Sequence, residues 1–173
     1  MMRSVKVAVV AGICLLALPS ICQQGTAACG NPAIKFDVKT ADSISTVPQP
    51  AAGIALVVFV GKDAGTAMAS TTRVAIDGNW VGATHGSSYF YFSVEPGVHH
   101  VCTLTKFNQV WAHPVTTAAA HFTAVAGETY FFEAKNYAFA DAQQFDVTLT
   151  PLDSDEGPIA ISNLPASEYR EKK

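Results

Sequence analysis

The chain has 173 residues, of which 14% are charged, and its formal net charge at pH 7 is −3. This length supports one domain with a hydrophobic core. The acidic balance disfavours a nucleic-acid partner, since such a partner requires a basic face that neutralises phosphates.

Residues 1–28 predict a secretory signal peptide rather than a part of the fold. Arg3 and Lys6 form a positive segment, and an apolar run follows over residues 7–18. This run is too short for a membrane span, which takes about 20 apolar residues. We expect cleavage after Ala28, which is preceded by small residues, and export to the periplasm or the medium.

Two of the four cysteines, Cys29 and Cys102, remain after such a cleavage. In an oxidising compartment they predict one disulfide that ties the N-terminus to the middle of the fold. The alternative makes Cys29 the lipidated end of an envelope-anchored lipoprotein, because small residues precede it as in a lipobox. Only then would the protein associate with a membrane, and Cys102 would be a free, buried thiol.

The segments after Cys29 alternate as β-strands do. Ile34, Phe36 and Val38 share one face of a predicted strand over residues 33–39, and residues 29–52 are interpreted as this strand and a linker. Residues 54–61 are continuously apolar and predict the central strand of a sheet.

Glycine-containing turns separate the next strands. Asp77 and Gly78 predict a tight hairpin, because both central residues of such a turn must tolerate positive φ. Residues 88–104 (SYFYFSVEPGVHHVCTL) predict a second hairpin, with Pro96 and Gly97 at its turn. Gly127 marks a third turn of the same kind.

The remainder of the chain completes an all-β domain. Residues 107–118 break the alternation and predict a connecting loop, whereas residues 144–150 alternate again as a strand. A short helix capped by acidic residues precedes Pro165, and residues 166–173 are a polar tail. We expect an antiparallel β-sandwich over residues 53–165, Ig-like or transthyretin-like, with about seven or eight strands and this C-terminal helix.

His99, His100 and Cys102 are metal-ligand types that stand close together in the sequence. His99 and His100 are adjacent on a strand, so their side chains point to opposite faces and cannot bind one ion without a bulge. We therefore expect no metal and no cofactor. The alternative is a copper or zinc site formed by His100, Cys102 and another histidine, taken from the dispersed set His85, His113 and His121.

No motif predicts catalysis. The chain has no G-x-S-x-G sequence, and Asp153, Asp155 and Glu156 resemble a helix cap more than a calcium loop. We expect a protein that is not an enzyme. Four aromatic residues are candidates for a binding surface, although aromatic residues on strands commonly pack against their neighbours: Tyr89, Tyr91, Trp111 and Tyr130.

The ordered segments IALVVFV, VAIDGNWVGATHGSSYFYFSVEPGVHHVC and HFTAVAGETYFFEAK resemble the bacterial family catalogued as domain of unknown function 2846. The resemblance covers residues 53–150, and five turn residues match its motifs: Gly78, Gly82, Pro96, Gly97 and Gly127. It implies an exported β-sandwich located in the cell envelope, and it implies no activity.

These observations lead to one functional expectation. The protein is a non-enzymatic envelope or periplasmic module that binds an envelope protein or a cell-wall component. The contact would use strand edges, loops or the aromatic face.

Overall fold

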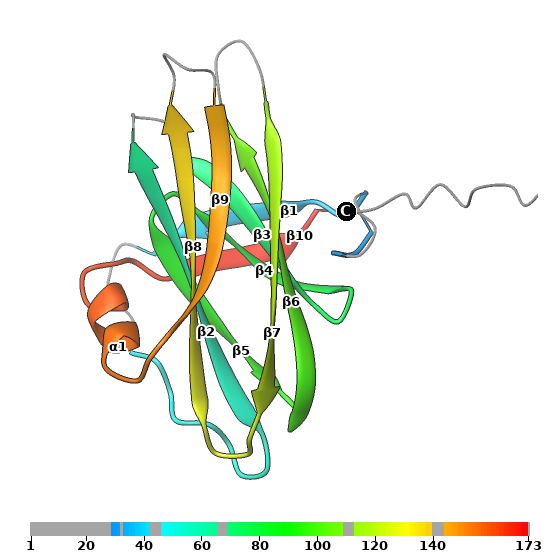
Figure 1. The fold of residues 1–173 in the computed structure, drawn as a ribbon, viewed down its shortest axis with the longest axis vertical. Coiled ribbons are helices and arrows are strands. Elements are labelled where there is room, and N and C mark those ends of the chain that lie inside the picture. The colour runs from blue at the N-terminus through cyan, green and yellow to red at the C-terminus, as the bar shows by residue number, and fades with distance from the viewer. Residues whose placement is uncertain are drawn as a thin grey trace, which may run out of the picture.

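The computed structural model describes residues 29–31, 33–41, 46–65, 69–108, 113–139 and 144–172. The expected signal peptide and Trp111 lie outside these ranges. The described chain is an all-β sandwich with a short C-terminal helix, as the sequence predicts (Figure 1). Within these ranges, no helix has the length and apolarity that crossing a membrane requires.

Two four-stranded sheets form the sandwich. The first sheet has the order β5 (Ser88–Val94), β2 (Ala55–Gly65), β8 (Thr129–Phe139) and β9 (Gln144–Leu152). The second has the order β4 (Asn79–His85), β3 (Ser70–Ile76), β6 (Gly97–Phe107) and β7 (Val115–Ala124). Neighbouring strands are antiparallel except β2 and β8, which are parallel.

The main core lies between the two sheets. It includes Val57 and Phe59 of β2, Val74 of β3, Val101 of β6 and Phe132 of β8, each at most 1% exposed. These residues occupy alternate positions of their strands, as half-buried β-strands require. The central strand predicted over residues 54–61 is therefore confirmed as the buried part of β2.

A second apolar cluster covers the outer face of the first sheet. Leu56, Val58 and Tyr89 pack there against Leu164, in the segment after helix α1 (Glu156–Ile161). The helix can approach because Gly157 has no side chain, and a Cβ at that position would lie 2.2 Å from the ring of Phe131. The first sheet is consequently buried on both faces near its centre.

Acidic residues cap α1, as predicted, but the side chain of the N-cap residue Asp155 forms no capping hydrogen bond. Asp153 accepts hydrogen bonds from the backbone N–H groups of Asp155 and Glu156, and Glu156 accepts one from the N–H of Asp153. This reciprocal pattern is a capping box. Hydrogen bonds from Glu156 and Asp155 lower the pKa of the Asp153 carboxyl.

The hairpin predicted at Asp77 and Gly78 is confirmed. It joins β3 to β4, and its two central residues have φ angles of 50° and 79°. A φ above zero at a non-glycine residue is uncommon, and aspartate tolerates it better than most residues.

The hairpin predicted over residues 88–104 is wrong. β5 pairs with β2 in the first sheet, whereas β6 pairs with β3 and β7 in the second. Pro96 and Gly97 do reverse the chain, but they carry it from one sheet to the other. The turn at Gly127 also connects the two sheets, from β7 to β8.

Two further segments differ from the sequence-based expectation. β7 begins at Val115, inside the predicted connecting loop, and forms the true hairpin partner of β6. The polar tail contains strand β10 (Ser167–Glu171), which pairs with β1 (Phe36–Thr40) as a separate two-stranded sheet. The ring of Tyr169 packs on Phe36 and Phe90, and this packing explains why the polar segment forms a strand.

Candidate functional site

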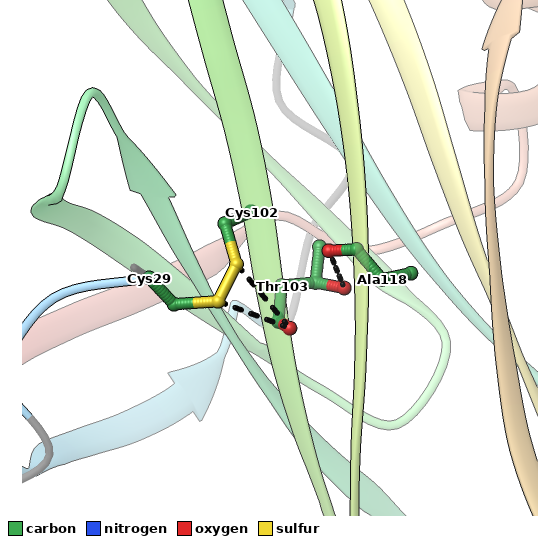
Figure 2. The surroundings of a disulfide bond; sticks show 4 residues. All are labelled: Cys29, Cys102, Thr103 and Ala118. Atoms are coloured by element: carbon green, nitrogen blue, oxygen red, sulfur yellow. Dashed lines mark hydrogen bonds between the residues drawn. A yellow bond between two sulfur atoms is a disulfide. The ribbon is translucent and has the colours of Figure 1, made fainter. Parts of the chain in front are cut away.

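The predicted disulfide between Cys29 and Cys102 is present, with the two Cα atoms 5.1 Å apart (Figure 2). This distance lies within the usual range for disulfides. Cys29 is fully buried, and its sulfur lies 3.9 Å from the carbonyl oxygen of Thr103. The bridge thus holds the segment before β1 against the outer face of β6.

His99 and His100 lie on opposite faces of β6, as predicted. The ring of His99 packs on Phe122 of the main core cluster, whereas His100 is exposed and its ring lies 6.2 Å from that of His121 on β7. Cys102 shares the face of His100, but its sulfur is bonded to Cys29. A thiolate ligand is therefore not available in the disulfide-bonded protein.

The other histidines do not complete a metal site in the described part of the chain. His85 is hydrogen-bonded to Thr71 at 3.2 Å, and His113 lies just before β7. No group of three or more His, Cys, Asp or Glu side chains comes together among the described residues. What remains is the cross-strand pair of His100 and His121.

His99 is held between two acceptors. Its ring nitrogens lie 2.7 Å from the carboxylate of Asp77 and 2.7 Å from the carbonyl oxygen of Glu95. Desolvation lowers the pKa of His99, but the hydrogen bonds to Asp77 and Glu95 and the charge of Asp77 outweigh it, so the pKa is raised. Two acceptors require two N–H donors, which only the protonated imidazole has.

The three described residues of the candidate aromatic surface do not come together as one exposed surface. Tyr89 is fully buried, and Tyr130 packs on Phe122 while its hydroxyl accepts a hydrogen bond from the N–H of Val125. Tyr91 is 40% exposed. The fourth candidate, Trp111, lies outside the described residues.

Polar side chains connect the two sheets near one end of the core. Asn136 of β8 is 2% exposed, and its amide bonds to Asp63, Ser70 and Thr72 at 2.8–3.2 Å. Its carbonyl oxygen accepts a hydrogen bond from Thr105 at 3.0 Å. Sequence reasoning missed this network, although the alternation from Phe132 onward places Asn136 on the inner face.

Three of the four edges of the two four-stranded sheets are covered or protected. β1 and β10 lie beside β4, and the segment at Pro165 and Ala166 bonds to Tyr89 of β5. β9 carries Asp146 and Pro151, which disfavour the addition of another strand.

The fourth edge, β7, has no charge or proline, and β9 of the other sheet lies beside it without forming a strand pair with it. Its ten residues, VTTAAAHFTA, include no Lys, Arg, Asp, Glu or Pro, and its single hydrogen-bonded neighbour among the described strands is β6. Alternate residues from Val115 to Thr123 are exposed. Along an edge strand, every second residue directs its N–H and C=O groups away from the sheet.

Comparison with known proteins identifies no relative: no family model matches, and neither the curated proteins nor the solved structures contain a match. The resemblance to domain of unknown function 2846 therefore remains a prediction. The candidate functional site is defined by geometry alone, as the edge of β7 whose single hydrogen-bonded neighbour among the described strands is β6.

Proposed function

We propose that this protein is an exported, non-enzymatic binding module of the bacterial cell envelope that captures a partner protein by strand addition at β7. The uncharged β7 edge carries the proposal. Proteins normally protect an edge of this length with charges, proline or a covering segment, because unpaired backbone groups recruit other strands. Strand addition is also a common mode of peptide recognition.

The composition of β7 indicates which partner segment would fit. Three of its exposed side chains, Thr117, Ala119 and Thr123, are small and neutral, and Val115 and His121 are exposed on the same face. A neutral, extended segment can approach such a surface closely without leaving a charge unpaired. The signal-like first 28 residues and the Cys29–Cys102 disulfide support an oxidising compartment outside the cytoplasm.

Site-specific photo-cross-linking in producing cells tests this proposal. A cross-linking residue placed at Thr117, Ala119 or Thr123 should give adducts with the same second protein. A cross-linking residue at the exposed Thr148 of β9 is the matched control and should not give this adduct.

The second arm of the experiment introduces positive charges on β7. Thr117→Lys combined with Ala119→Lys should abolish the adduct formed from Thr123 without lowering the melting temperature, since both positions are exposed. Thr148→Lys should leave the adduct intact. An adduct that survives the two β7 lysines, or that contains only a second copy of this chain, contradicts the proposal.

Metal binding is the second candidate, and one observation favours it. His100 and His121 stand opposite each other on adjacent antiparallel strands, and both are exposed. Two imidazoles could hold a copper or zinc ion whose other ligands are water. Metal analysis of the purified protein tests this, and stoichiometric metal that is lost in His121→Gln would favour it over strand binding.

A further inference from the structure

A depression of about 300 Å³ lies on the outer face of the second sheet, beside the segment that leads into β1. Four basic residues line it: Lys35, Arg73, Lys106 and Lys172. The chain has 11 Lys and Arg residues in total, so more than a third of them gather here. The described lining includes no aspartate or glutamate. In an acidic protein, this concentration of positive charge is unexpected.

The strand register brings two of these cations together. Lys106 of β6 lies opposite Thr71 of β3, and Arg73 lies two residues further along β3, opposite Leu104. Diagonal neighbours of this kind on one sheet face are about 7–8 Å apart. Like charges at this separation repel each other, so an anion between them would stabilise the folded protein.

Arg73 is fixed in place, and none of the salt bridges found among the described residues gives it an acidic partner. Its guanidinium lies 4.6 Å from the centre of the Trp80 ring, and it donates a hydrogen bond to the carbonyl oxygen of Ile34. Trp80 is itself held by a 2.8 Å hydrogen bond to the carbonyl oxygen of Asn31. Desolvation by burial lowers the pKa of Arg73.

The three lysines of the depression differ in whether a carboxylate lies near enough to neutralise their charge. Lys172 lies 3.9 Å from Asp37, which also pairs with Arg170 at 3.2 Å. Lys35 and Lys106 take part in none of the salt bridges found among the described residues. Together with Arg73, they give the depression three cations without a counter-ion from the described part of the protein.

We propose that this depression binds a small anion that carries a phosphate group. A phosphate presents up to two negative charges and three acceptor oxygens, and the planar guanidinium of arginine matches it in a two-bond geometry. The apolar part of the lining, formed by Phe36, Leu104 and Val115, would contact a small apolar substituent. The volume lies at the lower end of ligand pockets and suits a compact ligand rather than a polymer.

The disulfide connects this site to the redox state. Lys35 lies in the segment before β1 that the Cys29–Cys102 bridge holds against β6, and Phe36 is the first residue of β1. Reduction would release that segment from Cys102, and one side of the depression would lose its covalent support. The reduced protein should therefore bind the anion more weakly than the oxidised protein.

Calorimetric and thermal titrations of the purified, disulfide-bonded protein test the proposal. The probes are inorganic pyrophosphate and phenyl phosphate, with citrate as a control anion. A phosphate probe at about ten times its Kd should raise the melting temperature by roughly 3–5 °C. Citrate at the same concentration should give a smaller rise. Equal stabilisation by citrate would overturn the assignment of phosphate.

Matched variants locate the binding. Lys106→Gln and Arg73→Gln should each weaken phosphate binding at least about tenfold, as expected for the loss of a charged contact. Lys106 is exposed, so its replacement should leave the ligand-free melting temperature unchanged even if Arg73→Gln is destabilised. Lys135→Gln makes the same charge change on β8 of the other sheet and should bind as the parent does.

Vesicles distinguish the source of the phosphate. Co-sedimentation with phosphatidylglycerol vesicles that is lost in Lys106→Gln would assign the ligand to a lipid headgroup. Pyrophosphate binding without such co-sedimentation would assign it to a free phosphate compound. Failure of all phosphate probes to bind, or binding unaffected by both Lys106→Gln and Arg73→Gln, would overturn the proposal.

Discussion

His99 and Asp77 are 22 residues apart in sequence, and their side chains meet at 2.7 Å between Nδ1 and Oδ2. The other carboxylate oxygen of Asp77 accepts the backbone N–H of His100 at 2.8 Å. One carboxylate in the β3–β4 turn thus binds both residues of the histidine pair at the start of β6.

This pair predicts a pH dependence of stability. Because the pKa of His99 is raised, its contribution to the free energy of unfolding is fully present below pH 6.5, the ordinary histidine value. This contribution is lost as the pH rises through the pKa of the folded state. Desolvation raises the pKa of Asp77, but hydrogen bonds from His100 and His99 outweigh it. The net pKa is lowered, so the contribution of Asp77 disappears as the pH falls below 3.8.

Denaturant unfolding across this pH range measures the effect. In His99→Gln, the free energy of unfolding should decline less steeply above pH 6.5. At pH 6 it should be lower than that of the parent by about 1–2 kcal/mol. His121→Gln is the control, since its side chain is exposed and the hydrogen bonds of Asp77 are formed with His99 and His100 instead. An unchanged slope in His99→Gln would show that another group causes the pH dependence.

The second prediction concerns the polar network in the core. Asn136→Ala would leave the hydroxyls of Ser70, Thr72 and Thr105 without their shared partner, and we expect a loss of about 3 kcal/mol. Asn136→Asp should be worse at pH 7, because it places a second carboxylate beside Asp63. Acidification to pH 4 should narrow the difference between these two variants. If Asn136→Ala melts like the parent, the network does not stabilise the fold.

The position of Asn136 illustrates what the sequence could and could not predict. Alternation predicted which residues face inward, and the sandwich, its helix and the Asp77–Gly78 hairpin follow from such local patterns. Alternation says nothing about which strand is the neighbour. Pro96 and Gly97 can reverse the chain within one sheet or between two sheets. In the structure they connect β5 of the first sheet to β6 of the second, where the sequence predicted a hairpin.

Local sequence patterns also do not predict contacts between segments that are distant in the sequence. The basic depression joins residues from Lys35 to Lys172, and no short window of sequence contains more than one of its cations. The sequence of β10 predicts a polar tail, because most of its residues are charged. Its single large inward residue, Tyr169, is too little for a periodic signal.

The third prediction concerns the disulfide. Cys29 and Cys102 are 73 residues apart, and the chain-entropy estimate for a loop of this length is about 4 kcal/mol. Reduction should lower the melting temperature, and the Cys29→Ser/Cys102→Ser variant should melt like the reduced parent. Intact-mass analysis provides the check, because an acyl group on Cys29 would contradict the disulfide.

The fourth prediction concerns Gly97, whose φ of 145° is rare for residues with a side chain. No atom lies within 4 Å of a Cβ built there, so Gly97→Val should cost only backbone strain, about 1–3 kcal/mol. Gly82→Ala should cost more, because its Cβ would lie 2.4 Å from the ring of Phe90. The opposite order in thermal melts would contradict this assignment of strain and overlap.

The β1–β10 ladder also determines how the domain would respond to mechanical tension. Phe36 pairs with Glu171, so a force that separates the two ends of the chain acts on one end of this ladder. Such a geometry opens hydrogen bonds one after another and resists little. The disulfide changes the path of the force, because a pull applied before Cys29 is passed directly to Cys102 on β6. In the oxidised protein the sandwich is loaded through its second sheet, whereas after reduction the small sheet would open first.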